Sequence, residues 1–283
     1  AWRAKGYITA MTGDGVNDAP SIKSADIGVG MGITGTDVTK NVADMVLADD
    51  NFATIVHAVE EGRRIYDNIR KAVGYVFSIH IPIAFASLLA PVLGIAPVAL
   101  FLLPLHVVLL ELIIDPTCSI VLERQPAERD IMERKPRDPK EKLLTPRILI
   151  KSVIQGLVIF AASFGTYLTV LAGNEANAPV ARTMGLAIIM LSNLLLVQVN
   201  SSECDFAFRS VIRLAKDKVM WGVNIFTIIG LAAILYTPLA EFLKLAPLSA
   251  TQLFTAVGIA VAAVLWYEIV KLVKKLVGRK REV

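Results

Sequence analysis

The sequence predicts an α-helical membrane bundle of six transmembrane helices, preceded by the end of an α/β domain. Three observations lead to this fold class. The 283 residues are 55% hydrophobic, and their mean hydropathy of +0.60 is too high for an ordinary soluble protein. Six separate apolar segments are each long enough to cross a hydrocarbon core of about 30 Å. The first 50 residues instead alternate short apolar runs with helix-compatible segments, which is typical of a parallel sheet.

The α/β part is expected over residues 1–50. The predicted strands and helices are, in order, Tyr7–Met11, Ala19–Ala25, Ile27–Met31, Asp37–Ala43 and Met45–Leu47. This stretch is too short for a complete doubly wound domain, so it is interpreted as the last strands of one. The chain also begins at Ala1 without an initiator methionine. We therefore expect a piece of a longer protein whose earlier part is missing.

The stretch Asn51–Ala90 joins the two parts. Its first half places apolar residues on one helical stripe and charged residues elsewhere, and the charges stop after Lys71. We predict a stalk helix over residues 51–71 that continues into the first span of a membrane domain over residues 72–283. A continuous helix of this length, about 60 Å, can carry motion between a soluble site and a membrane site. The alternative is a hinge at Gly62 or Gly74.

Five further spans are predicted: Val98–Leu122, Ile148–Leu171, Val180–Val199, Val219–Tyr236 and Leu253–Val270. Lysine and arginine collect in the loops after the second and fourth spans and in the tail, whereas the alternate loops carry only Lys244. By the positive-inside rule, both termini are cytoplasmic. We expect a multi-pass protein of the plasma membrane whose basic tail contacts anionic lipid, and no nucleic-acid partner. Cys118 and Cys204 have no metal-site spacing and are interpreted as packing residues.

A turn with two glycines follows the first predicted strand. Thr12-Gly13-Asp14-Gly15-Val16-Asn17-Asp18 places two carboxylates and a carboxamide close together. Gly13 and Gly15 let the backbone bend sharply and approach a ligand. Hard oxygen donors beside backbone N–H groups suit Mg²⁺ together with a phosphate. A turn selected for its conformation alone explains the heptapeptide equally well.

Two carboxylates lie in the second span. Glu111 and Asp115 are four residues apart and share a helical face. Carboxylates inside a membrane are costly unless they are paired, coordinated or hydrated, and they mark ion paths. Pro116 has no N–H, which frees the Leu112 carbonyl to act as a ligand. An ion site is favoured over a proline kink with two water-exposed acids.

Three more polar residues are weaker candidates for the same site. In the first span, Pro82 frees the Ser78 carbonyl beside His80. His80 by itself is more typical of a hydrogen-bonded core histidine than of a ligand. Asn193 in the fourth span fits helix packing as well as ion binding.

The turn and its surroundings closely resemble a known family. Thr12-Gly-Asp-Gly-Val-Asn-Asp-Ala-Pro20, followed by Ala25-Asp-Ile-Gly-Val-Gly-Met-Gly32 and by a helix entering the membrane, is similar to the P-type cation-transporting ATPases. The likeness is to their type II branch, which includes calcium pumps, and it covers the whole chain. It implies that residues 1–50 end a haloacid-dehalogenase-like, Rossmann-like phosphorylation domain.

The resemblance also implies roles for the turn. Asp14 would bind Mg²⁺ at the phosphorylation site of an enzyme that uses ATP, and Asn17 and Asp18 would help to position the metal and the phosphoryl group. Thr12 would lie nearby. The chain contains no Asp-Lys-Thr-Gly-Thr, the motif that the family phosphorylates. The nucleophile and most of the nucleotide site would then come from the missing amino-terminal portion, and this chain alone should be inactive.

In the membrane, the resemblance gives a mixed set of ligands. Asp115 stands at the position of the family's cation-binding aspartate, and Asn193 matches a third acidic position. Glu111 and His80 each replace an asparagine usual in calcium pumps, and Ile83 replaces a glutamate. One divalent ion, or an ion exchanged for protons, fits this set better than two calcium ions. No Cys-Pro-Cys motif is present, which disfavours Cu⁺ and Zn²⁺.

We therefore predict the carboxy-terminal half of an ATP-driven, Mg²⁺-dependent cation pump with an aspartyl-phosphate mechanism, exporting a divalent cation such as Ca²⁺. Two alternatives belong to other classes. One is a non-catalytic membrane subunit or fragment that only binds a partner. The other is a membrane-tethered phosphatase of the same α/β fold.

Overall fold

The computed structural model describes residues 2–138, 140–202 and 218–279. The chain divides into two compact units, Ala1–Arg63 and Arg64–Val283, which are treated separately below. Arg209, Arg213 and Lys216, which belong to the basic loop after the fourth predicted span, lie outside the described residues, as does Cys204.

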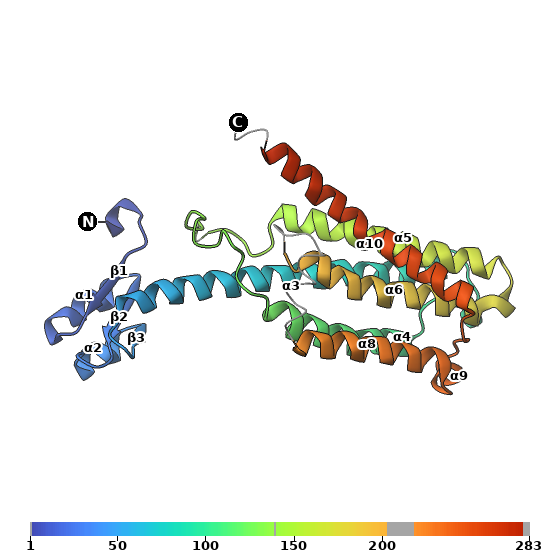
Figure 1. The fold of residues 1–283 in the computed structure, drawn as a ribbon, viewed down its shortest axis with the longest axis horizontal. Coiled ribbons are helices and arrows are strands. Elements are labelled where there is room, and N and C mark those ends of the chain that lie inside the picture. The colour runs from blue at the N-terminus through green and yellow to red at the C-terminus, as the bar shows by residue number, and fades with distance from the viewer. Residues whose placement is uncertain (1, 139, 203–217, 280–283) are drawn as a thin grey trace. The chain divides into compact units, whose positions relative to one another are not determined.

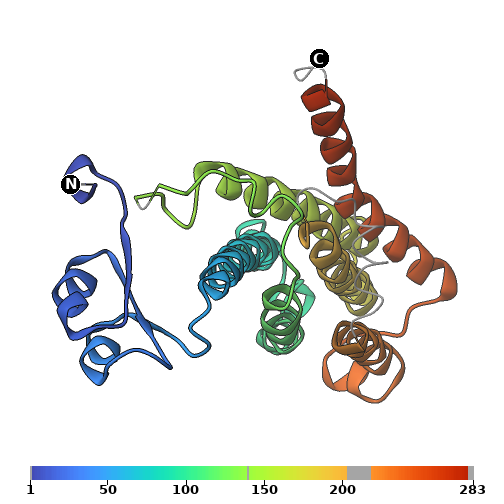
Figure 2. The ribbon, with the colours of Figure 1, turned by 60° about the vertical axis from the view of Figure 1, so that its left-hand side comes forward.

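The first unit contains a three-stranded parallel sheet in the order β1 (Ala10–Gly13), β2 (Ile27–Met31) and β3 (Met45–Leu47). The short helices η1 (Arg3–Lys5), η2 (Val16–Asp18), α1 (Ala19–Ser24) and α2 (Asp37–Val42) complete it, and Figure 2 shows α1 and α2 beside the sheet. Ile22, Val29 and Leu47 are fully buried between these layers. The order of strands and helices follows the predicted alternation.

The first strand starts later than the sequence predicts. Tyr7 and Ile8 are exposed and precede β1. The backbone N–H and the hydroxyl of Thr9 both donate to Asp26 Oδ2, at 2.9 and 3.0 Å. The Thr9 carbonyl accepts from the Ile27 N–H at 3.1 Å, but its amide is taken by a side chain, so the strand starts at Ala10. The predicted strand Tyr7–Met11 is therefore wrong at its first three positions.

The membrane part is helical (Figure 1). Its elements are α3 (Phe52–Val92), η3 (Pro97–Ala99), α4 (Pro104–Pro116), the π-helical segment η4 (Thr117–Leu122), α5 (Pro146–Leu171), η5 (Glu175–Asn177), α6 (Ala178–Asn200), α8 (Lys218–Tyr236), α9 (Leu239–Phe242) and α10 (Ala250–Arg279). In the described part of the chain, six helices are long and apolar enough to span a membrane, as predicted.

Two details of the spans differ from or sharpen the prediction. α3 is one helix whose backbone stays helical through Gly62 and Gly74. The predicted second span Val98–Leu122 is not one α-helix. It begins in η3, continues through irregular residues 100–103 to α4, and turns π-helical directly after Pro116. Proline cannot donate to the preceding turn, and π-helical turns occur frequently at functional sites.

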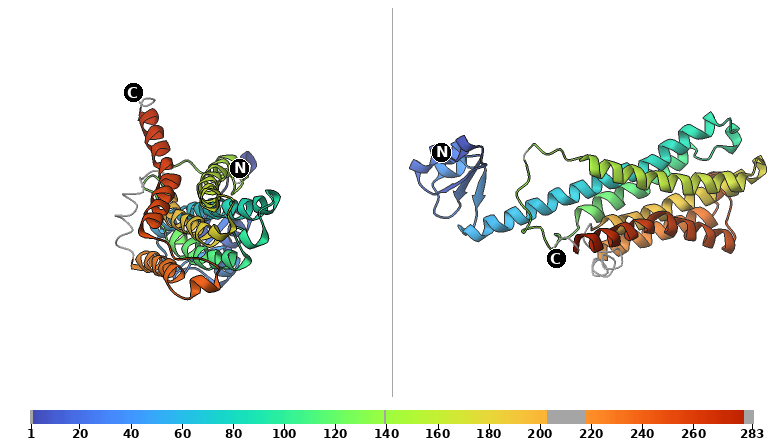
Figure 3. Two further views of the ribbon diagram at one scale, coloured as in Figure 1. Left: turned by 90° about the vertical axis from the view of Figure 1, so that its right-hand side faces the viewer. Right: turned by 90° about the horizontal axis from the view of Figure 1, so that it is seen from above.

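The bundle is centred on α6, because 78% of the residues in its most apolar stretch are buried. α5 and α10 pack along it (Figures 1 and 3). α5 also approaches α3 closely at Gly156. A Cβ atom there would lie 2.6 Å from both the Ser78 carbonyl oxygen and the Ile81 Cβ. Small residues allow membrane helices to approach in this way.

At the start of α6, buried Arg182 holds two loops by their backbones. It donates to the Leu100 oxygen at 2.6 Å, to the Lys244 oxygen at 3.3 Å and to the Val98 oxygen. His106, also buried, lies 2.7 Å from the Leu243 oxygen through Nε2. Its Nδ1 accepts from the Leu103 N–H at 3.2 Å, so Nε2 carries the hydrogen. These side chains satisfy loop carbonyls that lipid could not.

Candidate functional site

The turn after β1 is held by one of its own carboxylates. Asp18 Oδ2 accepts from the N–H of Gly15 at 3.1 Å and of Asp14 at 3.3 Å. A Cβ atom at Gly13 would lie 2.6 Å from the Asp18 Cβ, so a larger residue would displace that side chain. Asp18 therefore has a conformational role in the turn, whatever else it binds.

Asp14 is held in the turn by its backbone and not by its side chain. The Asp14 backbone oxygen accepts from the Thr36 N–H at 2.9 Å and lies 3.2 Å from Thr39 Oγ1. The carboxylate is exposed and makes no hydrogen bond or ion pair within the described residues. It follows the carboxyl end of a parallel strand, the edge where α/β sheets bind ligands. The free oxygens of Asp14 thus fit a hard cation such as Mg²⁺.

The remaining predicted residues of the turn lie around Asp14. Asn17 is exposed and Thr12, Gly13 and Gly15 are half-buried. Thr39 Oγ1 also lies 3.0 Å from the Gly15 oxygen and ties α2 to the turn.

Asp50 is a structural residue that the sequence did not indicate. Its carboxylate accepts from the N–H groups of Gly32, Ile33 and Thr34 at 2.6, 2.9 and 2.7 Å, and from the Thr34 hydroxyl at 2.8 Å. These hydrogen bonds, first that of Ile33, lower the pKa of Asp50 to about 2. The residue fixes the loop after β2, next to the Asp14 turn in the sheet order.

In the membrane part, the structure brings His80 of α3 and Glu111 of α4 together. His80 Nε2 lies 3.2 Å from Glu111 Oε1, and the two side chains are 46% and 35% exposed. His80 Nδ1 lies 2.8 Å from the Val76 carbonyl oxygen. A carbonyl can only accept, so Nδ1 carries a hydrogen and Nε2 faces the carboxylate. The sequence indicated both residues but not their contact.

The other predicted ligands are not brought to this pair by any contact within the described residues. The Asp115 side chain lies outside the part of the chain that the structure describes. Asn193 is 3% exposed, and its Oδ1 has no hydrogen-bond partner among the described residues. The Ser78 carbonyl oxygen lies against Gly156 of α5 instead of facing α4. In the same part of the chain, no three His, Cys, Asp or Glu side chains cluster for a metal.

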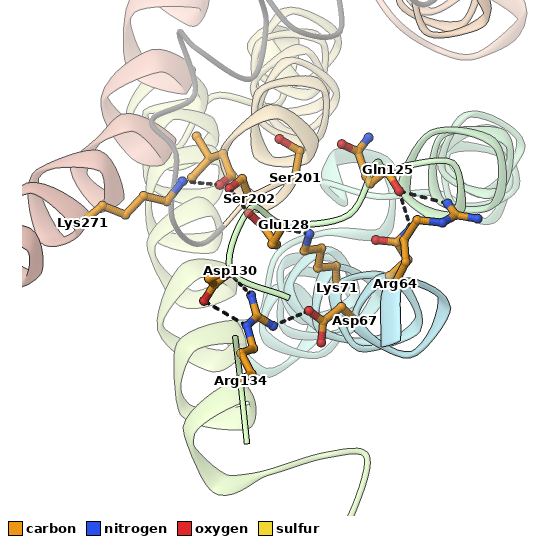
Figure 4. A network of polar contacts seen from close by, with 12 residues as sticks. Arg64, Asp67, Lys71, Gln125, Glu128, Asp130, Arg134, Ser201, Ser202 and Lys271 are labelled. Carbon is orange, nitrogen blue, oxygen red and sulfur yellow. Dashed lines mark hydrogen bonds and ion pairs between the residues drawn. The ribbon is translucent and has the colours of Figure 1, made fainter. Parts of the chain in front are cut away.

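A polar network joins α3 to the connection after η4 (Figure 4). Lys71 lies 2.8 Å from Glu128, both nearly buried, and Ser202 donates to the other Glu128 oxygen at 2.9 Å. Arg134 contacts Asp67 of α3 at 2.5 Å and Asp130 at 2.7 Å. These carboxylates, Asp130 first, raise the pKa of Arg134, and Arg134 in turn lowers the pKa of Asp130.

Asp67, Lys71, Glu128, Asp130 and Arg134 of this network line a cavity of about 270 Å³, which Gly74, Ser152 and Asn200 also line. Arg64 adds a contact to the Gln125 oxygen at 3.0 Å, and Asn68 donates to the Glu123 and Gln125 oxygens. α3 is thereby fastened to the connection at four successive positions along one face, and through Glu128 to the end of α6. The sequence showed the charges but not their partners.

Together, six apolar helices and a histidine–carboxylate pair between two of them define an integral, multi-pass membrane protein. Comparison with known families identifies it further. The family described as cation transporting ATPase, C-terminus, matches residues 99–273. The chain belongs to this family and is a C-terminal region of a P-type ATPase.

Several curated relatives support this assignment. A calcium-transporting ATPase of Bacillus subtilis is 38% identical over 238 residues, which cover 84% of this chain and 26% of the relative. A calcium-transporting ATPase of Listeria monocytogenes is 36% identical over 97% of this chain and 30% of its own length. The sodium/potassium-transporting ATPase subunit alpha-1 of Oreochromis mossambicus is 46% identical over 60% of this chain and 16% of its own length. The chain spans less than a third of each of these relatives.

Proposed function

We propose that this chain is the carboxy-terminal part of an ATP-driven pump that exports a divalent cation such as Ca²⁺ across the plasma membrane. Both termini are cytoplasmic in this proposal. The observation that carries it is the contact between His80 and Glu111 across two apolar helices. A carboxylate in a span costs several kcal/mol unless it is paired or coordinated, so it is retained for a function such as ion binding. The names of the calcium-transporting relatives support a divalent cation as the transported ion.

The first unit would contribute to phosphoryl transfer. Its parallel strands support a haloacid-dehalogenase-like domain, completed by the missing amino-terminal portion that would also supply the phosphorylated aspartate and most of the ATP site. Asp14 would hold Mg²⁺, which would neutralise charge on the phosphoryl group. Asp18 keeps the turn in shape through two backbone N–H groups. Asn17 and Thr12 would contact the phosphoryl group. This chain alone would not turn over.

The membrane part would bind the transported ion. Glu111 and His80 would provide two donors from neighbouring helices, and Asp115 a third, one turn from Glu111. Asn193 is a further candidate because its buried Oδ1 has no partner among the described residues. α3, continuous from Phe52 to Val92, would couple the two functions.

The test uses the full-length protein that contains this chain. Asp115→Asn and Glu111→Gln each keep the side-chain shape and remove one charge. We expect cation-dependent phosphorylation from ATP to fall strongly in the first variant and measurably in the second, since divalent binding depends steeply on ligand charge. Glu175→Gln, in η5 and outside the proposed site, is the matched control and should behave as the wild type.

Wild-type cation dependence in both site variants, for every ion tested, would place the ion path elsewhere. The alternatives have their own signatures. Phosphatase or ATPase activity of the 283-residue chain alone, abolished by Asp14→Ala, would favour a membrane-tethered phosphatase. A full-length protein that forms no phosphoenzyme with any cation would favour a non-catalytic subunit.

A further inference from the structure

The membrane site offers a nitrogen ligand as well as an oxygen ligand. His80 offers an imidazole nitrogen and Glu111 a carboxylate oxygen, 3.2 Å apart and from different helices. Two lone pairs at this distance need a positive charge between them, which either a proton or a bound cation provides. Two donors that each lie about 2.1 Å from one metal ion are about 3.0–3.4 Å apart at octahedral to tetrahedral angles. The observed separation is thus compatible with one ion bound by both.

His80 is also held as metal-binding histidines are held. Its Nδ1 hydrogen is donated to the Val76 carbonyl at 2.8 Å, one turn earlier on α3. A histidine that ligates a metal almost always donates its other ring N–H in this way, which fixes the tautomer and raises the basicity of the ligating nitrogen. His106 has the opposite arrangement, with Nδ1 accepting and Nε2 donating to backbone, so both of its nitrogens are occupied.

The surroundings offer few oxygen donors from α3. Ca²⁺ takes six to eight oxygen ligands. Ile83, almost one turn beyond His80, is aliphatic and buried. The carbonyl that Pro82 frees, that of Ser78, lies against Gly156 of α5. Ser78 and His80 are two residues apart, which puts them on opposite sides of the helix. The donor of α3 that contacts Glu111 is the His80 imidazole.

We propose that His80 and Glu111 make this site selective for a divalent first-row transition-metal ion, of which Mn²⁺ is the probe, over Ca²⁺. Imidazole nitrogen suits such ions, whereas Ca²⁺ takes oxygen ligands. Carboxylate ligands extend the suitable range to Mn²⁺, and soft Cu⁺ would need sulfur ligands. The inference rests on the proposed pump function, because it names the ion class of the same site.

The first measurement compares Mn²⁺ and Ca²⁺ in the full-length protein at a fixed excess of Mg²⁺. We expect half-maximal phosphorylation from ATP at a Mn²⁺ concentration at least about 10-fold below that for Ca²⁺, the size of effect typical of a ligand or its supporting partner. His80→Asn should raise the Mn²⁺ concentration by about 10-fold or more and change that for Ca²⁺ little, so the preference is lost. His57→Asn, on an exposed part of the same helix, is the matched control.

The second measurement does not depend on turnover, and its first part uses the wild-type protein alone. Electron spin-echo spectroscopy of Mn²⁺ bound to the full-length protein should show modulation from a coordinated imidazole nitrogen. The signal should disappear in His80→Asn and persist in His57→Asn. Mn²⁺ at Asp14 would contribute none, because the turn offers oxygen donors only.

The outcomes separate the inference from the pump proposal. If Ca²⁺ supports phosphorylation at lower concentration than Mn²⁺, and bound Mn²⁺ shows no imidazole nitrogen, the selectivity inference is wrong and the pump proposal stands. If no cation supports phosphorylation in the wild type, both are wrong. The inference is supported if His80→Asn, but not His57→Asn, loses the nitrogen signal and needs a higher Mn²⁺ concentration for half-maximal phosphorylation.

Discussion

Single side chains organise the loops of the first unit, and Asp50 is the clearest case. Its carboxylate binds three successive backbone N–H groups from a residue with φ of 48°. Asparagine tolerates this left-handed conformation, so Asp50→Asn removes the charge without straining the backbone. We expect amide hydrogens of residues 32–34 to exchange several-fold faster in this variant at pH 7, measured by mass spectrometry on the whole chain. Asp37→Asn, in the same unit, should leave that segment unchanged.

The pKa of Asp50 sets the pH range of this effect. The folded value, about 2, lies below the ordinary value of 3.8. The ionised group therefore stabilises the loop fully above about pH 4, and the stabilisation is lost as the pH falls towards 2. Equal exchange of residues 32–34 in the wild type and Asp50→Asn would mean that the carboxylate does not hold the loop.

At the scale of residues, the sequence indicates which side chains are candidates for the site but not which of them are in contact. Glu111 and His80 were both indicated because ionisable groups are rare in apolar segments. Their contact depends on which face of α3 meets α4, and neither periodicity nor motif specifies that. Asp50 could not be recognised, since its role exists only once Gly32–Thr34 folds back over it. The role of Arg182 could have been suspected from the sequence, because it is a lone cation within a predicted span.

The elements themselves were predicted well where a physical limit determines them. α5, α6 and α8 match the predicted spans closely because membrane thickness dictates their length. α5 begins at Pro146 because Thr145 caps it by accepting from the Ile148 N–H. α10 continues beyond Val270 because charged residues end a span but not a helix. The π-helical segment after Pro116 gave no signal of its own in the sequence.

Gly156 allows a direct test of helix packing. Gly156→Ala should destabilise the bundle by about 1–3 kcal/mol, because the new Cβ would lie 2.6 Å from a backbone carbonyl that cannot rotate away. We expect a lower midpoint of thermal unfolding in detergent. Gly165→Ala on the same helix is the matched control, since no atom lies within 4 Å of its added Cβ. An unchanged midpoint in Gly156→Ala would contradict the close approach of α3 and α5.

For the whole protein, the important property of α3 is that it bears residues of both units and is fastened by Asp67 and Lys71 to the connection after η4. Inserting Gly-Gly after Asp67 would rotate the part of α3 before the insertion by about 200° relative to the part after it. Asp67 and Lys71 would then no longer lie on the same face of the helix. In the full-length protein we expect phosphorylation to persist and vesicle transport per phosphorylation event to fall severely.

An alanine-pair insertion in the exposed turn 172–174 is the control for the extra length, and it should leave transport intact. Transport that remains coupled after the Gly-Gly insertion would show that α3 does not act as a rigid connection.

The capture of loop carbonyls by Arg182 has a consequence for the order of biosynthesis. The Val98 and Leu100 carbonyls leave the ribosome about eighty residues before Arg182, and the Lys244 carbonyl about sixty residues after it. The last acceptor, like the Leu243 carbonyl used by His106, arrives only with the final helical hairpin. A nascent chain that stops before this hairpin would hold Arg182 and His106 each with a hydrogen-bond donor that lacks its acceptor, so these two buried side chains would be fully paired only in the finished chain.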